Sequence, residues 1–162
     1  VVEETMETCV EGIFACGNVV HVHDLVDYVT RESIIAGRSA SDYILRHKEA
    51  EKEEDKESKT DRQTGHIRTV PAHGVRYVVP QQICLREHPD GLKLSFRVDG
   101  VYRDIRIAVK CDGQEVYSVR RQIVTPGEME TLTLKPELLT ELDSCSTLRV
   151  ELVKGTVPQE TG

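Results

Sequence analysis

The stretch DIRIAVKCDGQEVYSVRRQ, residues 104–122, decides the fold class of this chain. In its first half Ile105, Ile107 and Val109 alternate with polar or small residues, so one face of the segment packs on a core and the other meets solvent. Asp112 and Gly113 tolerate the positive φ angles of a tight turn. The stretch therefore predicts a β-hairpin.

The same pattern extends outward over residues 65–162, where short runs rich in Val, Ile, Thr and Tyr are separated by Asp-Gly and Pro-Gly breaks. About seven short strands at this spacing predict an antiparallel β-sandwich of immunoglobulin or fibronectin type. Pro136–Leu142 is expected to form one short helical turn. The expected strands are Val75–Val79, Gln82–Arg86, Lys93–Val98, Asp104–Cys111, Glu115–Gln122, Glu130–Leu134 and Thr147–Val153.

A charged segment precedes this module. From Arg46 to Thr64 the chain contains no Val, Ile, Leu or aromatic residue, so it has no apolar face to bury. Residues 48–64 are therefore predicted to be a solvated helical extension and linker between residues 1–47 and residues 65–162.

The segment Thr8–Leu45 predicts a strand, a sharp turn, a loop and a helix. Gly12–Cys16 is expected to be a short buried strand that ends at Gly17, where the missing side chain lets a ligand approach the backbone. Asn18 then projects from the carboxyl end of that strand. The helix is expected to begin near Asp24 and to place unpaired N–H groups beside the turn. Its apolar pattern runs through Leu25, Val29, Ala36, Ala40 and Tyr43 or Ile44.

The pattern T-x-V-x-G-I-F-A-x-G-N at residues 8–18 resembles the last flavin-contacting motif of the pyridine nucleotide-disulfide oxidoreductase superfamily. The resemblance implies that Asn18 accepts a hydrogen bond from the flavin ribityl chain, beside Gly17. It also implies that Leu25 and Val26 supply backbone N–H groups toward the flavin ring. Glu11 replaces the usual Pro of the motif, and Asn18 replaces the usual Asp.

This resemblance implies that residues 1–47 are the C-terminal remnant of an α/β FAD-binding domain. The parent protein would transfer electrons between NAD(P)H, or a small reduced substrate, and FAD. Because no G-x-G-x-x-G turn is present, the upstream FAD and NAD(P) domains are expected to be missing. This chain alone is therefore expected neither to bind FAD nor to act as an enzyme. Without its parental sheet, the remnant should be disordered, dock on the sandwich or pair between copies.

The same segment also contains residues typical of two other kinds of chemistry. Cys9, Cys16, His21 and His23 offer zinc-type ligands, but C-x6-C followed by H-x-H matches no compact zinc pattern, so no metal site is predicted. His23 is an alternative general acid or base beside the flavin. An ordinary loop histidine explains it as well, and no catalytic residue is assigned.

The alternative function is a non-enzymatic β-sandwich module for protein interaction or subunit docking. An arginine-rich face could dock an acidic partner, although a solvated strand face explains it as well. Its members are Arg97, Arg103, Arg106, Arg120 and Arg121.

Composition limits the remaining partners and the compartment. A formal net charge of -7 argues against nucleic acid and anionic membranes. No apolar run is long enough to span a membrane, and five scattered cysteines suit reduced thiols, so the cytoplasm is expected. The expected partners are the missing upstream domains and a partner subunit or a second copy.

Overall fold

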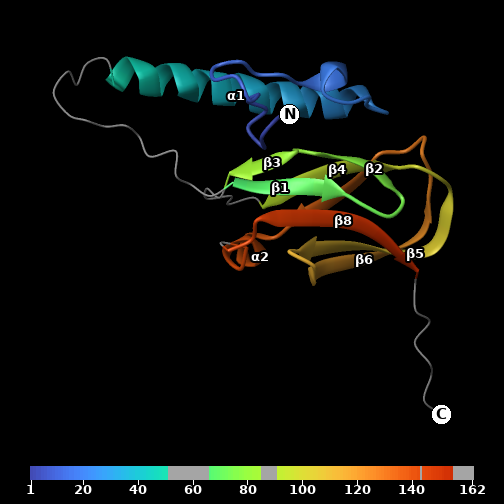
Figure 1. Ribbon diagram of the computed structural model, residues 1–162. Helices are drawn as coiled ribbons and strands as arrows, with labels where there is room; N and C mark the ends of the chain where they lie inside the picture. The colour runs from blue at the N-terminus through green and yellow to red at the C-terminus, as the bar shows by residue number, and fades with distance from the viewer. Residues whose placement is uncertain (51–65, 85–90, 143, 155–162) are drawn as a thin grey trace, which may run out of the picture.

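The computed structural model of the chain describes residues 1–50, 66–84, 91–142 and 144–154. Within these residues the chain is mainly β, with two sheets that occupy residues 66–154, hereafter the β module. A short 3-10 turn, η1 (Gly17–Val19), and a long helix, α1 (Val26–Ala50), precede it. Figure 1 shows α1 and the N-terminal residues together on one side of the β module.

The larger sheet has the strand order β3-β1-β8-β5-β6. Its strands are β1 (His66–Pro71), β3 (Gln82–Cys84), β5 (Tyr102–Cys111), β6 (Gln114–Val124) and β8 (Thr147–Lys154). The predicted hairpin is present, because β5 pairs antiparallel with β6 around Asp112 and Gly113, both at positive φ. One pair departs from the antiparallel arrangement expected from the sequence, since β1 and β8 run parallel.

The smaller sheet has the order β2-β4-β7, with both pairs antiparallel. Its strands are β2 (Val75–Val79), β4 (Leu92–Val98) and β7 (Glu130–Leu134). A short helix, α2 (Pro136–Thr140), follows β7, as the sequence predicts. The bounds of β2 and β7 agree with the predicted ranges, whereas Leu85 and Arg86 of the predicted third range lie outside the described residues.

The main core is built from apolar side chains of both sheets. Leu94 and Phe96 of β4 lie in one buried cluster with Ile107 of β5 and with Leu148 and Val150 of β8. Each of these five side chains is completely buried. Burying a large aliphatic or aromatic side chain stabilises a fold by about 1.5–3 kcal/mol, so this cluster is the main source of stability in the β module.

One sequence-based expectation is wrong at the level of a single element, and one strand was not predicted. Gly12–Cys16 is not a strand, because only Phe14 forms an isolated bridge, with Glu7, and Ile13 is 54% exposed. With no neighbouring parallel strand among the described residues, this apolar run has no ladder to join. Strand β1 was not predicted, since HIRTVP follows the charged segment after only Gly65 and ends in a proline.

The N-terminal residues and α1 dock on the β module, which is one of the three arrangements expected for them. Val2 and Met6 share a small buried cluster with Ala36 of α1 and Val79 of β2. Val2 and Gln81 exchange two hydrogen bonds, with Val2 N 2.8 Å from Gln81 Oε1 and Gln81 N 3.1 Å from Val2 O. The contact is therefore small, and polar groups supply part of it.

Helix α1 begins two residues after Asp24 and runs to Ala50, into the range 48–64 that was predicted as a helical extension and linker. The rest of the predicted linker, from residue 51 to 64, lies outside the described residues. Among the described helices, none is both long enough and apolar enough to cross a membrane.

Candidate functional site

The turn at Gly17 is held by a carboxylate from α1. Gly17 is buried, with a φ of +69°, and its N–H donates to Glu32 Oε2 over 2.9 Å. A Cβ at Gly17 would lie 3.2 Å from Val29 Cγ1, so the turn also packs closely on the helix. Glycine suits this position because it adopts a positive φ without strain.

Two imidazoles meet the same carboxylate and form the histidine–glutamate cluster, which consists of His21, His23 and Glu32. The Nε2 atom of His21 lies 2.6 Å from Glu32 Oε1, and that of His23 lies 2.9 Å from Oε2. Both histidine side chains are only 2% exposed, and that of Glu32 is 12% exposed. The His21 ring also meets the edge of Tyr77 of β2 at 5.9 Å between centroids, so the cluster lies where α1 faces the β module.

The surroundings hold Glu32 in its charged form. Burial by itself raises the pKa of Glu32, but the hydrogen bonds from His21 and from the Gly17 amide outweigh it and lower the pKa below 4.5. Lys93 of β4 faces the same region, and its ammonium lies 5.0 Å from the centroid of the Tyr28 ring. Burial, together with repulsion from Arg31, lowers the pKa of Lys93 despite the attraction of Glu32.

The four residues predicted to contact a flavin surround the start of α1. Asn18 is exposed, and its Oδ1 accepts a hydrogen bond from His23 N over 3.2 Å. Val26 is the first residue of α1 and is 79% exposed, while the preceding Leu25 is 58% exposed. Gly17 differs from these three, because it is buried and its N–H is engaged by Glu32.

The two cysteines of this segment, Cys9 and Cys16, do not join the two histidines. Cys9 is exposed, and the Sγ of Cys16 lies 3.6 Å from Ser33 Oγ on α1. The described residues instead bring Cys111 and Cys145 together with Asp112 in the β module, with one ligand atom of each within 4.8 Å of the others. Burial, with the neighbouring Cys111 thiol, raises the pKa of Cys145 to about 12, so its thiol is neutral.

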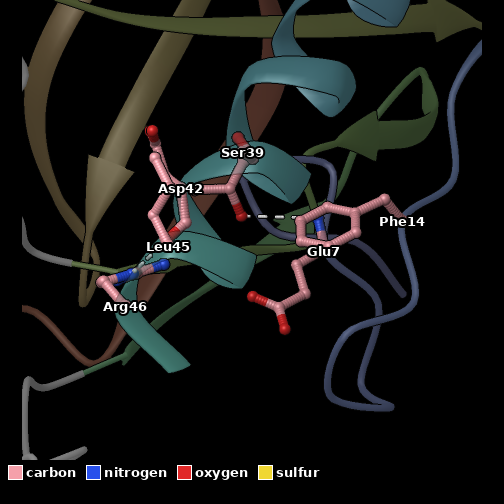
Figure 2. A pocket seen from close by; sticks show the side chains of 7 residues that line it. Glu7, Phe14, Ser39, Asp42, Leu45 and Arg46 are labelled. Carbon is pink, nitrogen blue, oxygen red and sulfur yellow. Dashed lines mark hydrogen bonds between the residues drawn. The ribbon is translucent and has the colours of Figure 1, made fainter. Parts of the chain in front are cut away.

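A cavity of about 350 Å³ lies between the N-terminal residues and the second half of α1 (Figure 2). Its lining mixes the ring of Phe14 with the charged groups of Glu7, Asp42 and Arg46. None of the four predicted flavin contacts lines it. The cavity is therefore a separate feature from the corner at Gly17 and Asn18.

The arginines expected to form a docking face are largely occupied within the chain. Arg97 pairs with Asp24, Arg106 with Glu115, and Arg121 with Glu130. These ion pairs neutralise arginine charges to which an acidic partner would otherwise bind.

Glu32 is the residue that sequence reasoning missed. It lies three residues after Val29 and four before Ala36, so it falls on the inward stripe of the helix. A carboxylate on such a stripe needs buried partners, and that signal could have identified it. Its partners His21 and His23 lie eleven and nine residues earlier in the chain, outside the periodicity of any one element.

No protein-family model, curated protein or solved structure matches this chain.

Proposed function

We propose that residues 1–47 are the C-terminal part of an FAD-binding domain and that the β module is a β-sandwich appended to it. The complete protein is an oxidoreductase that moves electrons between NAD(P)H, or a small reduced substrate, and FAD. The chain of 162 residues is its C-terminal fragment, and the fragment alone is not catalytic. The motif at residues 8–18 suggested this function, and the corner at Gly17 and Asn18 supports it, whereas Gly12–Cys16 does not form the strand of the motif.

The observation that carries the proposal is the placement of an exposed amide beside an exposed helix start. A buried glycine in the left-handed region turns the chain so that Asn18 faces solvent. The helix that follows spans 25 residues, and its first residue, Val26, is exposed. The first N–H groups of a helix lack intrahelical partners and carry a partial positive charge, which favours an acceptor such as a flavin carbonyl.

The residues at this corner fit the proposed contacts in part. The amide oxygen of Asn18 accepts one hydrogen bond from His23 N, and its second lone pair suits a ribityl hydroxyl. Leu25 and Val26 offer backbone N–H groups at an exposed position. The N–H of Gly17 is used by Glu32, so Gly17 serves to position Asn18 rather than to bind. The flavin, when bound, would supply the redox chemistry itself.

The exposed apolar surface of α1 supports the proposal that further domains cover it. Ile34, Ile44 and Leu45 are 48%, 51% and 55% exposed. Exposed apolar side chains that lie along one element favour a missing contact surface. In the proposed parent this surface lies against the sheet of the FAD-binding domain.

The test is purification of the protein from its complete reading frame. We expect one FAD per chain, and we expect Asn18→Ala to weaken flavin binding by about tenfold, since a lost hydrogen bond of this kind is worth about 1–1.5 kcal/mol. Asn18→Asp should bind at least as tightly, because a carboxylate is the stronger acceptor. Gln122→Ala, which removes an exposed amide from β6, is the matched control and should have no effect.

A complete protein that is colourless after gentle purification would overturn this proposal. It would leave the interaction or subunit-docking module as the function of the β module. Retention of stoichiometric FAD by the present chain would contradict the statement that the fragment does not hold flavin.

A further inference from the structure

We infer that His21, His23 and Glu32 form a binding site for one divalent first-row transition metal ion, of the class to which Zn²⁺ and Co²⁺ belong. One ligand atom of each residue lies within 4.8 Å of the other two. Two imidazoles and one carboxylate are the ligand set of zinc sites that keep an open position, and of the related iron sites. The ligand atoms of this site are separate from the proposed flavin contacts at Asn18, Leu25 and Val26, and the inference does not rest on flavin binding.

The distances in the cluster are close to those of a metal site. Zinc bonds of about 2.0–2.2 Å to nitrogen and oxygen place two tetrahedral ligand atoms about 3.3 Å apart. The two Nε2–Oε separations are 2.6 and 2.9 Å, so they must widen by about 0.7 and 0.4 Å to reach that separation. Rotation of the Glu32 carboxylate and of the two rings can supply this change.

The burial of the cluster favours an ion over a simple ion pair. A structural ion pair needs one imidazole, whereas here two rings with centroids 4.3 Å apart turn toward one carboxylate. The Nδ1 atoms of His21 and His23 are also buried and have no hydrogen-bond partner among the described residues. Among the described residues, Glu32 is therefore the one side chain that hydrogen-bonds both rings, and an ion between the three groups accounts for their orientation directly.

The backbone around the site fixes two of the three ligands. The N–H of Gly17 donates to Glu32 Oε2, which holds the carboxylate toward the loop. The amide of Asn18 accepts from His23 N, which fixes the backbone that carries the second imidazole. This support reduces the ordering cost of binding an ion.

The two unpartnered Nδ1 atoms also limit the affinity. Histidine ligands usually donate their other ring N–H to an acceptor, and loss of that acceptor weakens metal binding by about 10–100-fold. No such acceptor lies beside either Nδ1 among the described residues. We therefore expect an exchangeable ion that chelators remove without unfolding the β module.

The experiment is a titration of the metal-free 162-residue chain with Co²⁺, followed by displacement with Zn²⁺. We expect saturation at one ion per chain and visible ligand-field absorption without thiolate charge-transfer bands. In proton NMR, Co²⁺ should broaden the ring signals of His21 and His23 before those of His47, which is exposed. This measurement uses the unmodified chain and so does not depend on the folding of a variant.

Variants then assign the ligands. Glu32→Gln keeps the shape of the side chain and an acceptor for the Gly17 amide, and we expect it to lower Co²⁺ affinity by at least tenfold. His23→Asn should do the same. His47→Asn removes an exposed imidazole that pairs with Glu11, and it should leave affinity unchanged. Cys145→Ser should also leave it unchanged, because it alters only the cluster with Cys111 and Asp112.

Three results would overturn the inference. The first is failure of the unmodified chain to bind Co²⁺ saturably, and the second is unchanged affinity in His23→Asn. The third is loss of the signal in Cys145→Ser, which would place the ion in the β module. If Glu32→Gln loses the helix signal of α1 in circular dichroism, the His23→Asn variant and the ring broadening decide the question.

Discussion

The β module and the region that precedes it are held by different forces. In the β module, side chains such as Phe96, Ile107 and Leu148 are fully buried in one apolar core. In the first 50 residues, by contrast, the apolar side chains that are buried are small or few, namely Val2, Met6 and Ala36. Hydrogen bonds and ion pairs supply much of the remaining contact there. We therefore expect acid and salt to destabilise mainly the N-terminal region. Loss of apolar volume should destabilise mainly the β module.

The largest expected effect tests the apolar half of this comparison. Phe96→Ala should lower the free energy of unfolding by about 3–5 kcal/mol, because it leaves a cavity in a packed core. Ile34→Ala on α1 is the matched change at a side chain that is 48% exposed, and it should cost no more than about 0.5 kcal/mol. Urea unfolding followed by circular dichroism measures both. Similar costs for the two variants would contradict the comparison.

A pair of glycines tests how rigid each region is. Gly91, before β4, and Gly17 both have a positive φ, so alanine at either position is strained by about 1–2 kcal/mol. At Gly91 the new Cβ would lie 2.5 Å from the backbone oxygen of Leu134, which cannot move without disturbing β7. At Gly17 it would meet only the side chain of Val29, at 3.2 Å.

Gly91→Ala should therefore cost about 1–3 kcal/mol more than Gly17→Ala, because overpacking adds to the strain. The thermal midpoint of the β module, followed through its strand signal, measures the difference. A larger drop for Gly17→Ala would show that the N-terminal region controls the stability of the whole chain.

Acid should destabilise the N-terminal region while the β module stays folded. Although burial alone raises the pKa of Glu32, its hydrogen bonds lower the pKa below 4.5 in the folded chain. The folded state then binds fewer protons than the unfolded state near that pH. The contribution of Glu32 is therefore complete above about pH 4.5 and is lost as the pH falls through the lower folded value.

The protection of the Gly17 amide, which Glu32 holds, should fall in this acid range, measured as its hydrogen-exchange rate relative to that of an unstructured amide at the same pH. Amides of β8 should remain protected. Glu32→Gln is the control, since the protection of its Gly17 amide should not change over this pH range. Simultaneous loss of protection in both regions would mean that they unfold together.

The smallest expected effect concerns the contact of Asp24 with the β module. Asp24 pairs with Arg97 of β4 and accepts from Met129 N over 2.6 Å. Burial raises its pKa, but the bonds from Arg97 and Met129 outweigh this and lower it. Exposed ion pairs are worth about 0.2–1 kcal/mol, and salt screens them. Asp24→Asn should weaken docking by that amount, measured as faster proteolysis before Val26, and high salt should remove the difference from the unmodified chain.

Much of the β module could be predicted from sequence because its signals are local. Alternation at Ile105, Ile107 and Val109 and the turn at Asp112 and Gly113 are properties of adjacent residues. Strand β1 was missed since it depends on a partner far along the chain, β8. The same limit applies to the corner at Gly17. The start of the following helix was predicted, but the hydrogen bond from the Gly17 N–H to Glu32 was not.

The Gly12–Cys16 segment shows the opposite failure. Its apolar run is typical of a buried strand, yet in this chain it lies as an irregular segment beside α1. A strand requires backbone partners, and sequence pattern alone does not say whether those partners are present. The residue types thus show that this segment is apolar, but they do not predict its backbone conformation.

The position of β8 has a consequence for synthesis on the ribosome. This strand lies in the middle of the five-stranded sheet, between β1 and β5, yet it is the last strand to be translated among the described residues. Until it leaves the exit tunnel, β1 with β3 and β5 with β6 are two separate hairpin-like pairs with open inner edges. Nascent chains stalled before Thr147 should therefore attract chaperones that cover unpaired strand edges, and release of the final strand should end that association.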